Sequence, residues 1–306
     1  MEKIFELLSS DGVTAIKGVM WLPEEDYPRG VLQIVHGVTE YAKRYDAFAQ
    51  YFVARGFAVV ASDHLGHGES YCGEENKMHF DCWDFVVQDV KTVYQITKEE
   101  YPDVPYFMMG FSLGSFASRQ FAYENPEALD GIIIAGTGYQ PKLITKVMRW
   151  IVNREGEKIG LNQTSDFIMD LAFGTYNKQV ECPKTEYDWL CSSLKDLKGY
   201  MNDPMVGKFV TAGLFREMLL GIEKTCDFEN IKKMNKKLPV LMMSGSDDPV
   251  GSKTKGVMKV FNLFKKAGIE NVKTIFYKNA RHDIFNEGKH RRSVRKSIVG
   301  WMEANI

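Results

Sequence analysis

Cysteine is sparse in this chain, and its pattern indicates neither cross-linking nor metal binding. Five cysteines occur among 306 residues, an odd number with no Cys-x-x-Cys pair and no zinc-type spacing. This excludes a disulfide framework of the kind that holds small secreted domains together. Free cysteines commonly pack as small hydrophobic side chains. We therefore expect reduced thiols and a cytoplasmic location.

Long hydrophobic runs and an excess of one charge are also lacking. The first ten residues hold no apolar core of a secretory signal, and no stretch approaches the roughly 18 uncharged apolar residues of a transmembrane helix. Lysine and arginine total 39, against 40 aspartates and glutamates. A nucleic-acid-binding protein should show a basic excess. The sequence therefore predicts no nucleic-acid partner and no membrane-spanning segment, and it indicates no oligomeric state.

Short apolar runs alternate with segments of helical periodicity along most of the chain. The runs are continuous, as is typical of parallel strands covered on both faces, and the expected strands are residues 14–21, 31–35, 58–62, 106–111, 132–135, 240–244 and 273–277. Apolar stripes predict helices between them, one ending at Gly56 and one capped by Ser252 and stopped by Gly268. This rhythm predicts an α/β fold with a mainly parallel, twisted sheet of about eight strands flanked by helices.

One interval interrupts this alternation. Between about residues 139 and 212 the sequence contains no convincing strand, only helical pieces such as 142–152 and 166–173. We expect an inserted helical cap over one edge of the sheet. The predicted organisation is a first part of the α/β core (1–139), a cap insertion (140–212) and a second part of the core (213–306).

The segment from Gly110 to Gly114 carries the clearest chemical signal. It reads Gly-Phe-Ser-Leu-Gly and matches G-x-S-x-G, directly after an apolar run and before a plausible helix at 115–123. This context is typical of a nucleophile elbow, a sharp strand-to-helix turn that presents the serine. The following helix aims its N-terminal N–H groups at the site and favours developing negative charge. Ser112 is therefore the predicted nucleophile.

A nucleophilic serine needs a general base that is oriented by an acid. In hydrolases built on this elbow the chain order is serine, acid, histidine. Four of the six histidines precede Ser112, which leaves His282 and His290. His290 lies in a basic helical segment, residues 289–296, that is typical of a solvated face. His282 follows the last expected strand, and we predict it to be the base.

The acid is expected directly after the second-to-last strand of the chain, because His282 follows the last one. That strand, 240–243, is followed by Ser-Gly-Ser-Asp-Asp-Pro, in which Asp247 and Asp248 are both suitable. Asp283 is too close to His282 in sequence to orient it easily and is expected to be a loop or capping residue. The residues themselves leave Asp247 and Asp248 as alternatives.

Two backbone N–H groups are expected to form an oxyanion hole. In such enzymes one comes from the residue after the nucleophile and the other from an earlier strand–helix loop. Here these are Leu113 and Val38, which follows the strand ending in His36-Gly37.

The two histidines within residues 63–70 could suggest a metal site, but no further cluster of potential ligands has suitable spacing. We predict no metal site.

Five segments together resemble the monoacylglycerol lipase and lysophospholipase group of α/β-hydrolases. The resemblance spans about residues 14–301 and is carried, in order, by residues 36–40 (HGVTE) with Arg44-Tyr45, 63–70 (DHLGHGES), 110–114 (GFSLG), 245–248 (GSDD) and 281–282 (RH). In that group the acid stands three residues after the glycine of G-x-x-D, which favours Asp248. Phe111 is a departure, since relatives often carry histidine before the serine.

The resemblance implies an α/β-hydrolase fold and ester hydrolysis through an acyl-enzyme, without a cofactor. Monoacylglycerols or lysophospholipids, small-molecule esters with an apolar acyl chain, are the implied substrates. The cap is expected to shape an acyl pocket and to offer a surface for peripheral membrane contact. Its apolar side chains suggested for the pocket are Met148, Ile151, Phe167 and Phe173, with packing inside the cap as the alternative role for each.

Other functions remain alternatives at this point. A serine aminopeptidase on the same fold would need acidic cap residues to bind the substrate amine, and Glu155, Glu157 and Glu186 are available. A thioesterase or acyltransferase would use the same triad. Epoxide hydrolase chemistry needs a carboxylate on the elbow, so Ser112 argues against it. A catalytically silent binding protein on this fold is the remaining alternative.

Overall fold

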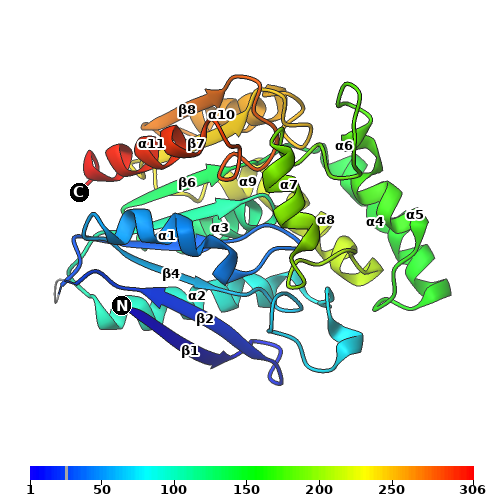
Figure 1. The fold of residues 1–306 in the computed structure, drawn as a ribbon, viewed down its shortest axis with the longest axis horizontal. Helices are drawn as coiled ribbons and strands as arrows, with labels where there is room; N and C mark the ends of the chain where they lie inside the picture. The colour runs from blue at the N-terminus through cyan, green and yellow to red at the C-terminus, as the bar shows by residue number, and fades with distance from the viewer. Residues whose placement is uncertain (25–26) are drawn as a thin grey trace.

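The computed structural model describes residues 1–24 and 27–306 and contains one eight-stranded sheet (Figure 1). The strand order is β1-β2-β4-β3-β5-β6-β7-β8, with β1 and β2 antiparallel to their neighbours and every other pair parallel. The expected α/β fold with a mainly parallel sheet is therefore confirmed. The strands are β1 (Glu2–Leu8), β2 (Ala15–Trp21), β3 (Val31–Val35), β4 (Ala58–Ser62), β5 (Tyr106–Phe111), β6 (Gly131–Ala135), β7 (Val240–Gly245) and β8 (Val272–Tyr277).

The first strand, β1, was not among the expected strands. It pairs with β2 along its whole length at the edge of the sheet, and most of its side chains are exposed. An edge strand with charged, solvent-facing side chains lacks the continuous apolar run that identifies the buried strands. The other seven strands lie where the apolar runs predict them, within one or two residues.

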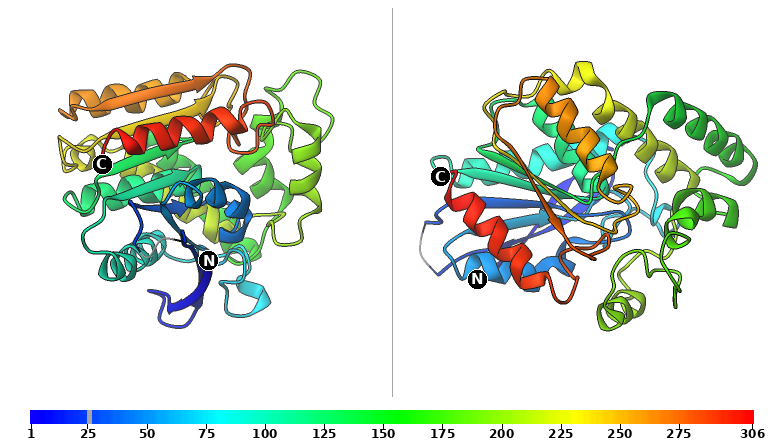
Figure 2. Two further views of the ribbon diagram at one scale, coloured as in Figure 1. Left: turned by 60° about the vertical axis from the view of Figure 1, so that its left-hand side comes forward. Right: turned by 90° about the horizontal axis from the view of Figure 1, so that it is seen from above.

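Helices cover both faces of the sheet and divide the core into two layers (Figure 2). Successive residues of β3 point to opposite layers, since Val31 and Val35 pack with one cluster and Leu32 and Ile34 with the other. The helices are α1 (Asp46–Val53), α2 (Trp83–Glu100), α3 (Leu113–Glu124), α4 (Lys142–Ile159), α5 (Asp166–Met169), α6 (Thr175–Asn177), α7 (Leu194–Asn202), α8 (Ala212–Cys226), α9 (Phe228–Ile231), α10 (Lys255–Lys266) and α11 (Arg291–Glu303).

The segment between β6 and β7 departs from the sheet layers. Its helices α4, α5, α6 and α7 lie beyond one end of the sheet (Figure 1). No strand occurs within residues 140–212, all of which the structure describes. We call these residues the insertion. A short π-helical turn, η3 (Asp170–Gly174), and an irregular stretch, 178–193, connect its helices.

The expected N-cap of α10 is wrong. The helix begins at Lys255, and its N-cap is Thr254 rather than Ser252. Ser252, Lys253 and Thr254 have φ values of 50°, 50° and 74°, so this stretch turns in the left-handed region. A capping serine needs extended backbone and accepts from an N–H two or three residues later, which the left-handed turn does not provide. The predicted stop is confirmed, because Gly268 has a φ of 88°.

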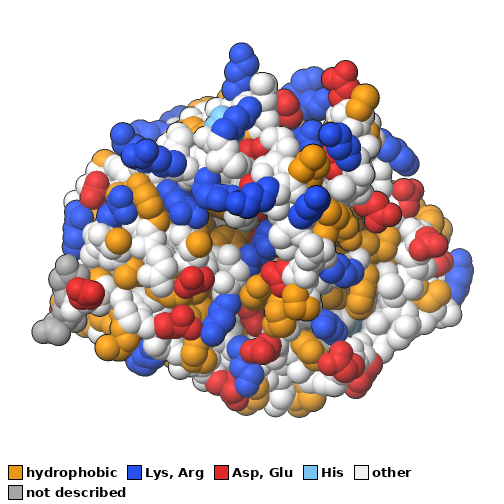
Figure 3. Space-filling view, viewed as in Figure 1, with side chains coloured by type: hydrophobic (Ala, Val, Ile, Leu, Met, Phe, Trp, Pro, Cys, Tyr) orange, Lys and Arg blue, Asp and Glu red, His pale blue; other side chains and the backbone are white. Residues whose placement is uncertain are grey.

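The basic segment 289–296 lies at the start of α11, and most of its charged side chains are exposed or half-buried. Basic side chains gather on the upper part of the molecular face in Figure 3 and mix with acidic ones below. None of the helices formed by the described residues is both long enough and apolar enough to span a membrane.

Three histidines are buried together at the carboxyl ends of β3 and β4. The ring of His36 lies 4.0 Å from that of His64 and 5.5 Å from that of His67. His36 donates from Nδ1 to the Gly37 carbonyl and accepts from the His64 N–H at Nε2, so it is neutral. Burial lowers the pKa of His64 to about 3 and that of His67 to about 4.

These histidines should make the fold sensitive to mild acid. Their folded pKa values lie below the unfolded value of about 6.5, so the unfolded chain binds more protons as the pH falls below 6.5. Each histidine that stays neutral in the fold should then lower the unfolding free energy by about 1.6 kcal/mol between pH 6.5 and 5. Urea unfolding of the wild type and of His67→Gln at several pH values measures how the unfolding free energy depends on pH. We expect the variant to lose stability less steeply, and an unchanged slope would contradict the interpretation.

Candidate active site

Ser112 occupies a strained turn between β5 and α3. Its φ of 52° and ψ of −115° place a non-glycine residue in a conformation that side chains rarely adopt. The flanking glycines permit the turn because neighbouring backbone leaves no room for a side chain. A Cβ on Gly110 would lie 2.3 Å from the Gly114 carbonyl oxygen, and one on Gly114 would lie 2.0 Å from that of Val35. The elbow predicted from G-x-S-x-G is thus present in the backbone.

The structure brings Ser112, His282 and Asp248 into one hydrogen-bonded chain. His282 Nε2 lies 2.9 Å from Ser112 Oγ, and His282 Nδ1 lies 3.0 Å from Asp248 Oδ1. The three come from three separate connections of the sheet, after β5, β7 and β8. A proton on Nδ1 leaves Nε2 free to accept from the serine hydroxyl, which is the arrangement that a serine nucleophile requires.

The geometry distinguishes the two aspartates that the residues alone left open. Asp248 is fully buried, and its carboxylate also accepts from the Val250 N–H at 2.9 Å and the Ser244 hydroxyl at 3.2 Å. Asp247 is exposed, and its carboxylate accepts from the Ser246 hydroxyl. The buried carboxylate of Asp248 is therefore hydrogen-bonded by His282, Val250 and Ser244, whereas that of Asp247 makes no contact with the imidazole.

Aromatic rings hold the imidazole of His282 from two sides. The ring centroid of Phe111 lies 4.9 Å away and that of Trp189 lies 5.3 Å away. His282 itself is only 1% exposed. Phe111, the departure from the family pattern, therefore packs against the base and leaves its contacts with Ser112 and Asp248 intact.

Val38 and Leu113 carry the two backbone N–H groups predicted to form the oxyanion hole, and this role stays a prediction. Leu113 is the first residue of α3, and Val38 lies in the loop after β3 and lines the same pocket as Ser112. Neither N–H donates to an acceptor on the residues that the structure describes. The Val38 N–H and the Gly37 carbonyl belong to the same peptide group. The carbonyl accepts from His36 Nδ1 at 2.8 Å. This contact limits rotation of that peptide group.

Ser112 and His282 open into a mostly apolar pocket of about 350 Å³ between the sheet edge and the insertion. Phe173 lines it, but the other three suggested acyl-pocket residues lie elsewhere. Met148 packs against the core, while Ile151 and Phe167 line a separate depression on the outer surface. Met148 and Ile151 belong to α4 and Phe167 belongs to α5, and none of the three lines the pocket that contains Ser112. Insertion side chains that line the pocket but were not anticipated include Met169, Tyr187, Trp189, Tyr200 and Phe209.

The insertion is bonded to the loop that carries the base. The Asp283 N–H donates to the Leu190 carbonyl at 2.7 Å, and the His282 N–H donates to that of Trp189 at 3.3 Å. The buried carboxylate of Glu287 accepts from the Ser192 N–H and the Arg281 N–H, both at 3.1 Å. These residues belong to irregular backbone without periodicity, which is why sequence patterns do not reveal them.

Among the residues that the structure describes, no three or more His, Cys, Asp or Glu side chains lie close enough together to hold a metal ion.

His290, the alternative base, contacts the Lys278 carbonyl, 2.9 Å from its Nε2. It therefore lies away from Ser112 and retains the surface role expected for it.

Known proteins support this picture at the level of family and fold. The model of the family described as "Serine aminopeptidase, S33" matches residues 26–289. A monoglyceride lipase homolog from Monkeypox virus is 27% identical over 90% of both chains. The monoacylglycerol lipase of Mycolicibacterium smegmatis is 25% identical over 94% of this chain and 92% of its own.

A solved structure agrees closely with the whole chain. The thermostable carboxyl esterase of Bacillus coagulans, in complex with glycerol, has a TM-score of 0.91 and 27% identity, covering 99% of this chain and 98% of its own. Because the family model spans most of the sequence and the eight-stranded sheet carries its serine on a strand–helix elbow, this chain belongs to the serine aminopeptidase S33 family and has the α/β-hydrolase fold.

Proposed function

We propose that this protein is a serine hydrolase that cleaves carboxylic esters through an acyl-enzyme, with monoacylglycerol- or lysophospholipid-type substrates. The observation that carries the proposal is the hydrogen-bonded chain Ser112–His282–Asp248 at an apolar pocket. The names of similar proteins, monoacylglycerol lipase and carboxyl esterase among them, support the same reaction class. The reaction needs no cofactor.

Acyl transfer proceeds in two balanced halves. Ser112 Oγ bonds to the ester carbonyl carbon while its proton passes to His282 Nε2, and Asp248 stabilises the imidazolium. The carbon–oxygen bond to the alcohol then breaks as His282 returns that proton to the leaving oxygen. Water next attacks the acyl-enzyme, giving its proton to His282, and Ser112 recovers a proton as the carboxylic acid departs.

The negative oxygen formed in each half lies between the N–H groups of Val38 and Leu113. One such donor is typically worth about 3 kcal/mol of transition-state stabilisation. The N-terminus of α3 adds a positive dipole end at the same place. The insertion acts as the cap, and the apolar side chains of Phe173, Met169 and Phe209 line the space for an acyl chain.

The family description also names aminopeptidases, so a peptidase is the second candidate function. It would require the acidic residues of the insertion to surround the substrate amine. Glu155 and Glu157 instead pair on α4 with Lys158 and Arg154, and of the three suggested glutamates only Glu186 lines the pocket. The apolar lining therefore favours an ester with an acyl chain. A thioesterase or acyltransferase would differ only in the leaving group or acceptor.

A lipid surface is the partner proposed for the outer face of α4. Four exposed apolar side chains are spaced along this side of the helix. They are Leu143 (73% exposed), Ile144 (49%), Val147 (49%) and Trp150 (62%). The same helix carries basic residues at positions 142, 146, 149, 154 and 158, and acidic residues only at positions 155 and 157. Exposed apolar side chains flanked by basic ones are typical of helices that lie on anionic membranes.

Ester hydrolysis should depend wholly on Ser112. We expect the wild type to cleave p-nitrophenyl esters and monoacylglycerols and to react with a fluorophosphonate, and Ser112→Ala to lose both activities by at least about 10⁴-fold. Aminoacyl-anilides and thioesters assayed beside an acyl-chain-length series separate the alternatives. Failure of the wild type to label or to cleave any ester would overturn the hydrolase proposal and favour a silent binding protein. Faster cleavage of anilides would favour the peptidase.

The α4 surface should govern binding to vesicles but not the chemistry. Val147→Glu combined with Trp150→Glu should weaken sedimentation with phosphatidylglycerol vesicles by about tenfold, because charged side chains no longer enter the lipid boundary. Hydrolysis of a soluble ester should stay unchanged. Leu8→Glu, at an exposed apolar position on β1, is the matched control. Equal vesicle binding by all three proteins would contradict this role of α4.

A further inference from the structure

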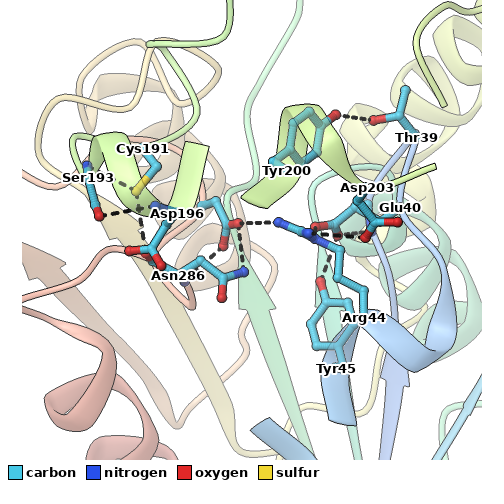
Figure 4. A network of polar contacts seen from close by, with 12 residues as sticks. Thr39, Glu40, Arg44, Tyr45, Cys191, Ser193, Asp196, Tyr200, Asp203 and Asn286 are labelled. Atoms are coloured by element: carbon cyan, nitrogen blue, oxygen red, sulfur yellow. Dashed lines mark hydrogen bonds and ion pairs between the residues drawn. The ribbon is translucent and has the colours of Figure 1, made fainter. Parts of the chain in front are cut away.

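A buried ion-pair network includes Glu40, which follows Val38 by two residues in the loop after β3 (Figure 4). Glu40, only 5% exposed, accepts from Arg44 Nε at 3.1 Å with one carboxylate oxygen. Its other oxygen accepts from the Gly37 N–H at 3.1 Å and from the Tyr45 hydroxyl at 2.8 Å. Glu40 therefore binds the backbone of its own loop, at the residue immediately before Val38.

These contacts fix the peptide group that presents the Val38 N–H. The Gly37 N–H is bonded to the Glu40 carboxylate, and the Glu40 N–H donates to the Gly37 carbonyl at 3.3 Å. Both ends of Gly37 are thus held by one residue, in addition to the bond from His36. Any rotation of the Gly37–Val38 peptide group would break the bonds to the Gly37 carbonyl.

Arg44 pairs with the Glu40 carboxylate and joins it to two other parts of the site. Burial raises the pKa of Glu40, and Arg44 opposes that rise. The guanidinium also lies 3.7 Å from Asp283, next to the base, and 3.9 Å from Asp203, at the end of α7. A single cation therefore balances carboxylates from the oxyanion loop, the base loop and the insertion.

The insertion supports the same loop from the pocket side. Thr39 has a φ of 70°, an unfavourable conformation for a β-branched residue. Its hydroxyl lies 2.6 Å from that of Tyr200, and its carbonyl accepts from the Gly207 N–H at 2.9 Å. The Arg44 guanidinium lies 5.0 Å from the centre of the Tyr200 ring. Such strain persists only where surrounding contacts overdetermine the conformation.

We propose that Glu40 and Arg44 form a buried brace that positions the Val38 N–H for the oxyanion. This rests on the ester-hydrolase function proposed above. Glu40 and Arg44 are positioning residues, because they act through Gly37 and Val38 and not through the reacting atoms themselves. An oxyanion donor acts on the transition state and not on the bound substrate, so the brace should influence kcat far more than KM.

The chain contains a closely matched control elsewhere. Glu217, 7% exposed, accepts from Arg216 Nε at 2.9 Å and from the Trp83 N–H at 3.1 Å. It resembles Glu40 in burial and in bridging an arginine and a backbone N–H. It does not line the pocket that contains Ser112. Replacing either glutamate removes similar contacts, but only Glu40 contacts the oxyanion loop.

The experiment compares Glu40→Leu and Glu217→Leu by thermal melting, by kcat and KM per titrated Ser112, and by affinity for an alkyl trifluoromethyl ketone. Addition of Ser112 Oγ to that ketone forms a hemiketal oxyanion, so its binding reports the oxyanion hole. For Glu40→Leu we expect a 10- to 100-fold lower kcat, KM within about threefold of the wild type, and ketone affinity weakened by the same factor as kcat/KM.

Glu217→Leu should lower the melting temperature while leaving kcat and ketone affinity within about twofold of the wild type. Glu40→Gln retains an oxygen for the Gly37 N–H and should lose less than about tenfold in kcat, which keeps the test decisive if Glu40→Leu does not fold. Equal kcat and ketone affinity in Glu40→Leu and Glu217→Leu, with an active wild type, would overturn the brace alone. A wild type that neither cleaves esters nor binds the ketone would overturn the hydrolase function itself.

Discussion

The hydrogen bond between His282 Nδ1 and the buried carboxylate of Asp248 is the contact on which the rest of the site depends. Asp248 has no exposed surface, so its carboxylate is hydrogen-bonded only by the protein groups that surround it. The bond at 3.0 Å holds the imidazole in the tautomer whose Nε2 faces Ser112. Without it the base could present the wrong nitrogen, and the serine would have no proton acceptor in place.

The pairing of the strands brings the residues of this contact together. Asp248 and His282 follow the neighbouring strands β7 and β8, and Ser112 follows β5, so parallel pairing brings their loops to one edge. Trp189 and Leu190 of the insertion then bond to the backbone of the base loop. The insertion is therefore part of the support for the base as well as a wall of the pocket.

Sequence reasoning located the reacting groups better than their surroundings. Ser112 lies in a motif whose strand and helix neighbours are recognisable. Chain order left His282 and His290, and the position of His282 after the last strand favoured it. Asp247 and Asp248 are adjacent and chemically alike, so only the resemblance favoured Asp248 before the geometry separated them. The sequence of two adjacent aspartates does not show which carboxylate is buried and which is exposed.

The pocket was anticipated poorly for a physical reason. Met148 and Ile151 were candidates for substrate contact and equally for packing within the cap, because an apolar side chain in a helical segment does not reveal which surface it meets. Trp189 and Tyr200 reach the pocket from segments whose positions depend on long-range bonds to the loops after β3 and β8. The edge strand β1 was missed because its exposed side chains carry no continuous apolar signal.

The most direct test of the account is the steady-state kcat of Asp248→Asn beside that of Asp247→Asn, with a soluble ester as substrate. The account predicts a loss of about 10⁴-fold for Asp248→Asn, because asparagine no longer holds the imidazole in the working tautomer. It predicts a change of less than about threefold for Asp247→Asn, whose side chain does not contact His282. A large loss in Asp247→Asn with near-normal activity in Asp248→Asn would contradict the assignment of the acid and the mechanism built on it.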